Sequence, residues 1–127
     1  MTLDLKDGRP IFIQIKEYIE QGVLSGNFGA DEQIPSTNQL VSYFGINPIT
    51  VMKGIGLLTD EGILYKKRGV GMFVSPGAID ILKKRYAGAL SEEFVQPLLN
   101  RARALGLTKE ELHKILDENW RDHHDRV

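Results

Sequence analysis

Two short helices separated by a single glycine are the feature that most limits what this 127-residue chain can fold into. Ser36 is a favourable N-cap, and the helix that it starts ends at Gly45, where glycine adopts the left-handed conformation that a sharp turn needs. Asn47 followed by Pro48 is a strong start for another helix, which runs towards Glu61. The pattern therefore predicts a helix, a tight turn and a second helix.

The flanking segments complete a small domain. Gln39 can complete a capping box with the helix start at position 36. After Pro10, apolar residues at helical spacing predict an earlier helix that ends near Gly26: Ile11, Ile15, Tyr18, Ile19 and Val23. Residues 63–67 and 72–74 read as two strands joined by a tip at residues 68–71. We expect a mainly α fold with a small β-hairpin, a winged helix-turn-helix, over residues 1–76.

The rest of the chain, residues 77–127, predicts a helical segment of a different kind. Apolar residues recur at three- and four-residue intervals, which suits one long helix bent at Pro97 or two helices divided near Ser91. Gly106 ends this region. Thr108 then forms a capping box with the glutamate three residues later, and the last helix runs to about Trp120.

This short tail needs a partner surface, and a second copy of the chain is the most economical one. The sequence therefore predicts a homodimer through the helical tail. The expected dimerisation residues are Ile79, Leu82, Tyr86, Leu90, Phe94, Leu98, Leu105, Leu112 and Leu116.

Composition narrows the possible functions. The chain has no cysteine, which excludes disulfides, thiolate metal sites and thiol nucleophiles and suits a reducing cytoplasm. The sequence shows no secretory signal and no apolar run long enough to cross a membrane, so we expect a cytoplasmic protein without a membrane partner. The net charge is −1, yet residues 33–75 carry a local excess of basic residues, which makes them the place to look for a polyanion contact.

The chemistry of this middle segment suits nucleic acid. Short polar side chains and Lys53 lie near the start of the third predicted helix, the end that reaches base edges in a helix-turn-helix. Lys66, Lys67 and Arg68 adjoin a glycine-bounded tip that can approach phosphate or enter the minor groove. A purely structural interpretation stays open, because the same shape forms corners of helical domains and the polar residues at helix starts can serve only as caps.

The run QIPSTNQLVSYFGINPITVMKGIGLLTDEGILYKKRGVGMFV resembles the DNA-binding domain of GntR-type bacterial transcription regulators. The shared features are a Pro-Ser opening, a glycine turn, a recognition helix, a Glu-Gly-Ile stop and a Gly-x-Gly-x-Phe-Val wing. Residues 46–53 and the short helical tail resemble the YtrA-type subfamily. The resemblance implies a homodimeric, operator-binding regulator, usually a repressor, with a two-fold-related operator on double-stranded DNA.

The resemblance places the recognition helix, about residues 47–61, in the major groove and the wing, residues 66–72, at the backbone or minor groove. Asn38, Pro48 and Met52 depart from the family pattern, which often has arginine at the last two positions and arginine or another polar residue at the first. The predicted DNA-contacting residues are Ser36, Thr37, Asn47, Ile49, Thr50, Lys53, Lys67, Arg68 and Gly69, and base specificity is expected from Asn47, Ile49, Thr50 and Lys53.

Two other classes of function are the alternatives to a regulator. A winged-helix protein-interaction module without DNA binding is the alternative to a regulator. An enzyme is not expected, because no nucleophile with a base at motif spacing and no phosphate-binding loop is present, so we predict no catalytic residue and no cofactor.

Further ligands have little support in the sequence. Asp122, His123, His124 and Asp125 offer metal-ligand side chains, but adjacent residues in a polar tail rarely form a closed site, so no metal site is predicted. Aromatic residues of the tail could line a pocket for a small-molecule effector, whose identity is unknown. Their helical spacing favours a dimer core instead.

Overall fold

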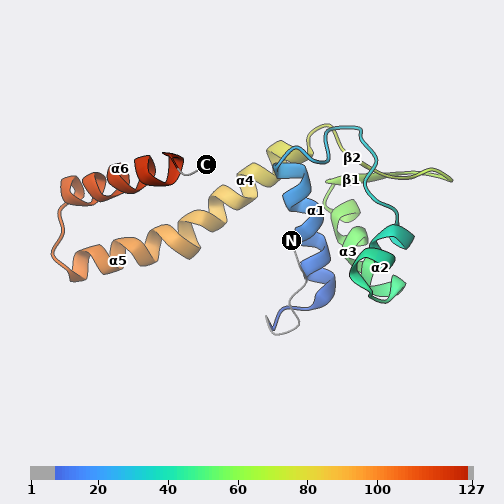
Figure 1. Ribbon diagram of the computed structural model, residues 1–127, viewed down its shortest axis with the longest axis horizontal. Coiled ribbons are helices and arrows are strands. Elements are labelled where there is room, and N and C mark those ends of the chain that lie inside the picture. The colour runs from blue at the N-terminus through green and yellow to red at the C-terminus, as the bar shows by residue number, and fades with distance from the viewer. Residues whose placement is uncertain (1–7, 126–127) are drawn as a thin grey trace. The chain divides into compact units, whose positions relative to one another are not determined.

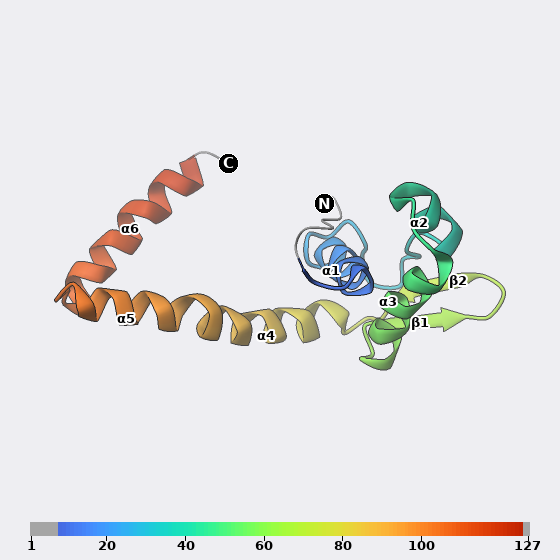
Figure 2. The same ribbon diagram turned by 90° about the horizontal axis from the view of Figure 1, so that it is seen from below.

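The computed structural model describes the backbone of residues 8–125 and the side chains of residues 8–121 (Figures 1 and 2). The chain divides into two compact units, Met1–Arg85 and Tyr86–Val127. The elements are α1 (Ile11–Leu24), α2 (Thr37–Phe44), α3 (Pro48–Asp60), β1 (Leu64–Lys67), β2 (Gly71–Val74), α4 (Ala78–Leu90), a π-helical stretch (Ser91–Val95), α5 (Gln96–Ala104) and α6 (Lys109–Asp125). The predicted fold class, mainly helical with one β-hairpin, is confirmed.

The core of the first unit forms between α1, α3 and the hairpin. The predicted apolar face of α1 supplies Ile15, Ile19 and Val23, all buried. They meet the predicted stripe of α3, which is Val51, Ile55 and Leu58, together with apolar residues of the hairpin. The helical periodicity therefore identified the buried faces of both helices.

The turn between α2 and α3 has the predicted caps. The hydroxyl of Ser36 accepts a hydrogen bond from the Gln39 backbone N–H (3.1 Å), and the Gln39 side chain accepts one from the Ser36 N–H (2.8 Å). Gly45 ends α2 with φ 66° and ψ 40°, in the left-handed region. Asn47 caps α3 by accepting from the Ile49 N–H at 2.8 Å.

Gly54 allows α1 and α3 to approach closely. A Cβ atom at this position would lie 2.7 Å from the carbonyl oxygen of Phe12 and 3.2 Å from the side chain of Ile15. Glycine costs a helix interior about 1 kcal/mol relative to alanine, and at Gly54 the close packing explains why it stands there. Gly56 differs, because a Cβ there would have no neighbour within 4 Å.

The hairpin forms the wing, defined here as residues 64–74. Lys67 pairs with Gly71, so the tip is one residue shorter than predicted and comprises Arg68, Gly69 and Val70. The N–H of Val70 donates to the Lys67 carbonyl at 2.9 Å, and Gly69 has φ 77°. A positive φ at the third position of a β-turn is accessible to glycine without strain.

Residues 31–34 lie along β2, a pairing that the sequence pattern did not predict. Asp31 N–H donates to the Val74 carbonyl (2.8 Å) and Ile34 N–H to the Met72 carbonyl (3.0 Å). The side-chain amide of Gln33 donates to the Val70 carbonyl at 2.9 Å. The segment before α2 therefore supports the base of the wing and its tip.

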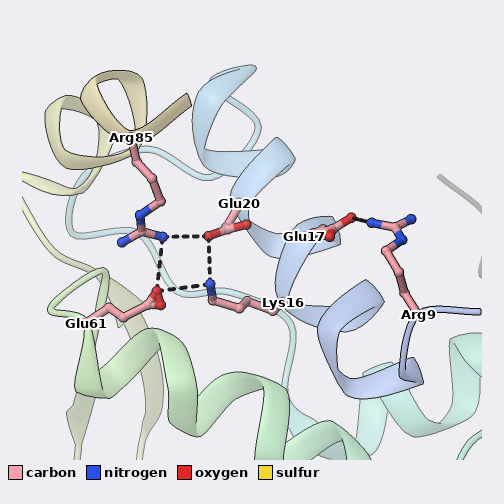
Figure 3. Close-up of polar contacts among 6 residues, drawn as sticks. All are labelled: Arg9, Lys16, Glu17, Glu20, Glu61 and Arg85. Atoms are coloured by element: carbon pink, nitrogen blue, oxygen red, sulfur yellow. Dashed lines mark hydrogen bonds and ion pairs between the residues drawn. The ribbon is translucent and has the colours of Figure 1, made fainter. Parts of the chain in front are cut away.

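Four charged side chains join α1, the end of α3 and α4 in a ring (Figure 3). The Lys16 ammonium lies 3.5 Å from the Glu20 carboxylate and 3.0 Å from that of Glu61. The Arg85 guanidinium lies 3.0 Å from both carboxylates. Glu20 is nearly buried, and such a carboxylate needs charged or hydrogen-bonding partners to offset the loss of water. A second ion pair joins Arg9, which precedes α1, to Glu17 of α1 (Figure 3).

The first turns of α4 belong to the first unit. Ala78 and Leu82 are fully buried there. This corrects the place of Leu82 among the predicted dimerisation residues, because its side chain is already covered by its own chain. Helical spacing predicts that a residue lies on the apolar face of its helix. It does not show whether that face packs against the same chain or against a second copy.

The backbone is helical throughout from Ala78 to Ala104, with its irregularity at the π-helical stretch. The sequence allowed one long helix bent at Pro97 or two helices divided near Ser91, and each alternative holds in part. The helix is continuous, but its hydrogen bonding changes at Ser91, where the second alternative divided it. The N–H of Gln96 donates to the carbonyl of Ser91, five residues back. Pro97 follows, and a wide turn accommodates its ring and its missing N–H.

The last helix, α6, starts at the predicted capping box. Thr108 N–H donates to Glu111 (3.0 Å), and Glu111 N–H donates to the Thr108 hydroxyl (3.1 Å). The hydrogen bond from the Thr108 backbone N–H, followed by one from the Thr108 side chain, holds the pKa of the Glu111 carboxyl below its usual value. The helix continues to Asp125, beyond the predicted end near Trp120, because no glycine or proline interrupts it. Among residues 8–125, no helix combines the length and apolar character needed to cross a membrane.

The two glycines of α3 give a matched test of its packing. Gly54→Ala should lower the free energy of unfolding, because overpacking costs about 1–3 kcal/mol and outweighs the gain in helix propensity. Gly56→Ala should raise it by up to about 1 kcal/mol, because the added methyl meets nothing. Urea unfolding of the full chain measures both. Equal stabilisation by the two substitutions would contradict the close approach of α1 and α3.

Candidate nucleic-acid interface

Three elements share one surface of the first unit: the start of α2, the outward face of α3 and the wing. They line a common pocket of about 520 Å³. The lining residues are Ser36, Thr37, Asn38, Met52, Ile55, Gly56, Thr59, Asp60, Lys66, Gly71 and Met72. The structure therefore brings together parts of the three segments in which DNA contacts were predicted, although of the predicted contact residues only Ser36 and Thr37 line the pocket. We call this face the candidate DNA-binding surface.

The electrostatics of the candidate DNA-binding surface favour an anion at the N-termini of α2 and α3. Neither α2 nor α3 has an acidic residue in its first turn, so nothing there opposes the partial positive charge of the unpaired N–H groups. Lys66, Lys67 and Arg68 are exposed on the wing. Asp60 lies in the pocket lining near the far end of α3, so the positive character belongs to the helix starts and the wing rather than to the whole surface.

The two predicted polar residues at helix starts have structural roles in this fold. Ser36 and Asn47 are both exposed, and the side-chain oxygen of each accepts a backbone N–H of its own helix. The cap interpretation is therefore confirmed for both, and their contact with DNA stays a prediction. Thr37 is half-buried and lines the pocket.

The outward face of α3 differs from the polar face that the sequence suggested. Ile49 is 74% exposed, whereas Thr50 is half-buried. The Lys53 ammonium lies 4.0 Å from the centroid of the Phe12 ring, in a cation–π contact with α1. Met52 is 60% exposed and lines the pocket, yet it was absent from the predicted contacts. Its spacing of three from Ile49 was the signal that could have found it.

The wing is held by aromatic and polar contacts. The Lys67 ammonium lies 4.3 Å from the Phe73 ring centroid, and Phe73 stacks on Tyr65 with 5.8 Å between centroids. The Tyr65 hydroxyl donates to Asp31 at 2.7 Å, and this bond raises the pKa of Tyr65. Arg68 and Gly69 lie exposed at the tip. Gln33, which binds the Val70 carbonyl, is a support that sequence reasoning missed.

Residues 8–121, whose side chains are described, contain no candidate metal-binding site. No group of three or more histidine, cysteine or carboxylate residues there could hold an ion. The side chains of the predicted ligand types, Asp122, His123, His124 and Asp125, lie outside the described residues. The structure therefore does not test this motif.

A glycine turn between α2 and α3, an outward-facing α3 and a β-hairpin beside it define a winged helix-turn-helix protein. The family profile described as "Bacterial regulatory proteins, gntR family" matches residues 13–74, which span this entire arrangement. The chain belongs to the GntR family, as the motifs predicted.

Three known proteins show the extent of the similarity. The transcriptional repressor YtrA of Bacillus subtilis is 28% identical over 118 residues, 93% of this chain and 90% of YtrA. A crystal structure of a putative GntR-family regulator from Bacteroides thetaiotaomicron matches with a TM-score of 0.74 and 26% identity, covering 89% of this chain and 98% of that one. The AraR DNA-binding domain, solved in complex with operator ORX1, matches with a TM-score of 0.56 and 33% identity, covering 59% of this chain and 95% of that one.

Other relatives are much longer than this chain. It covers only 31%, 27% and 18% of three repressors to which it is 33%, 36% and 38% identical, and each match lies over 75 residues or fewer. The similarity to YtrA, by contrast, extends through the tail and supports the predicted resemblance to the YtrA type.

Proposed function

We propose that this chain is a sequence-specific, DNA-binding transcription regulator that acts as a repressor. The observation that carries the proposal is the shared surface of the α2 start, the outward face of α3 and the cationic wing. On this proposal α3 enters the major groove, and the wing contacts the backbone or the minor groove. The operator complex of the AraR domain and the repressor YtrA support it by similarity.

The alternative classes of function gain no support from the comparisons. The matched family and its members are regulatory proteins, which favours DNA over a protein partner as the ligand of this surface and favours binding over catalysis. A regulator of this family acts on DNA, so we place the protein in the cytoplasm.

We further propose that the regulator is a homodimer through its second unit. Large apolar side chains stand exposed along that unit when the chain is taken alone. They are Leu90, Phe94, Val95, Leu98, Leu105, Ile115, Leu116 and Trp120. Tyr86 and Leu112, also predicted as contacts, are half-buried, as is Ile79 in the first unit. Burying this surface against a second copy would remove the cost of its exposure to water and place two recognition helices on a two-fold-related operator.

The wing can be tested with Arg68→Ala. If Arg68 contacts phosphate, the slope of log binding constant against log salt should become shallower by about one, because one fewer counterion is released. If it enters the minor groove, the loss should also depend on local A·T content. Fluorescence anisotropy with a duplex at several salt concentrations measures both.

Arg103→Ala is the matched control, because Arg103 is an exposed arginine of α5 in the other unit. It should leave the slope unchanged. An Arg68→Ala variant with wild-type affinity at every salt concentration would exclude the wing from the interface.

The dimer can be tested by sedimentation. The chain should sediment at twice its mass of 14.3 kDa, and Phe94→Glu should shift it towards the monomer, because a carboxylate would be buried without a partner. Ile81→Glu, at another exposed apolar position but in the first unit, should leave the dimer intact. A wild-type monomer at tens of micromolar concentration would contradict the assignment.

A further inference from the structure

The recognition helix presents two large apolar side chains, Ile49 and Met52, to solvent. Ile49 is 74% exposed and Met52 is 60% exposed. They are three residues apart, so their side chains are neighbours on one face of the first turns of α3. Single exposed apolar residues are ordinary. An adjacent pair near the N-terminus of α3, the end that a helix-turn-helix presents to DNA, points to an apolar contact there.

Two of the polar residues around them have side-chain partners within the chain, and the third is partly covered. The side-chain oxygen of Asn47 accepts the Ile49 N–H, and the Lys53 ammonium lies over the Phe12 ring. Thr50 is half-buried. The sequence pattern assigns base recognition mainly to these three polar side chains, whereas Ile49 and Met52 are the exposed large apolar residues of α3.

The surroundings of Met52 favour a nucleic acid over an apolar partner. Met52 lines the same pocket as Ser36, Thr37 and Lys66, which lie at the start of α2 and on the wing. Backbone N–H groups at a helix start and a lysine ammonium attract phosphate. A duplex held by these groups on either side would bring its base edges over the first turns of α3.

The major groove offers one apolar group that distinguishes base pairs, the C5-methyl group of thymine. We propose that Ile49 and Met52 are specificity-determining residues that contact thymine methyl groups in each operator half-site. The proposal rests on the proposed function. Residues three apart rise about 4.5 Å along a helix, close to the 3.4 Å separation of stacked bases, so the two side chains suit methyl groups on neighbouring base pairs.

The test removes the methyl group without changing base pairing. An operator is first selected from random duplexes with the full chain, and each thymine in the half-site is then replaced by deoxyuridine. Each methyl that contacts Ile49 or Met52 should weaken binding of the wild-type protein by about fourfold when removed, the value expected for one buried carbon group. Anisotropy titrations at one salt concentration measure the change.

Two variants assign the effect to the residues. Ile49→Ala and Met52→Ala should each bind the deoxyuridine and thymine duplexes equally at the position that the lost side chain contacts. Both positions are exposed, and thermal unfolding verifies that the variants fold. Ile81→Ala removes an exposed apolar side chain of α4 and should keep the full sensitivity to deoxyuridine.

The outcomes separate this inference from the proposed function. A selected operator that is insensitive to deoxyuridine, or whose sensitivity survives both substitutions, would overturn the methyl contacts and leave the regulator intact. Failure to select any sequence over random duplex would overturn the proposed function, and the methyl contacts with it.

Discussion

The close contact between α1 and α3 at Gly54 is the constraint on which the candidate DNA-binding surface depends. With no Cβ at this point, the Phe12 carbonyl and Ile15 approach the α3 backbone directly. This packing buries one face of α3 and turns the opposite face, with Ile49 and Met52, towards solvent. The ring of Lys16, Glu20, Glu61 and Arg85 (Figure 3) holds the far end of α3 against α1 and α4. The recognition helix is therefore fixed by contacts on its inner face and at its end, which leaves its first turns accessible to DNA.

Local signals explain why the helices and the wing could be predicted from the sequence. The capping boxes at Ser36 and Thr108 and the glycine turn at Gly45 depend only on residues a few positions apart, and the structure contains all three. Contacts between distant segments carried no such signal. The pairing of residues 31–34 with β2 and the burial of Leu82 both arise from tertiary packing, which sequence spacing does not encode.

The sequence predicted which helices and strands form the candidate DNA-binding surface better than it predicted the contacts of their side chains. The pattern located the α2 start, α3 and the wing, and the structure places them around one pocket. It could not show that the Lys53 ammonium meets the Phe12 ring, because the partner lies on another helix. In the sequence Met52 is only a departure from a family pattern that often has arginine, whereas its exposure makes it a central residue of the surface.

Hydrogen–deuterium exchange of the full chain with and without a selected operator duplex tests the central claim most directly, because it reports where on the protein DNA lies. The account predicts the strongest protection at amides of residues 36–53 and 66–72, which cover α2, the first turns of α3 and the outer part of the wing. Protection confined to residues 86–125, with the first unit unchanged, would contradict it.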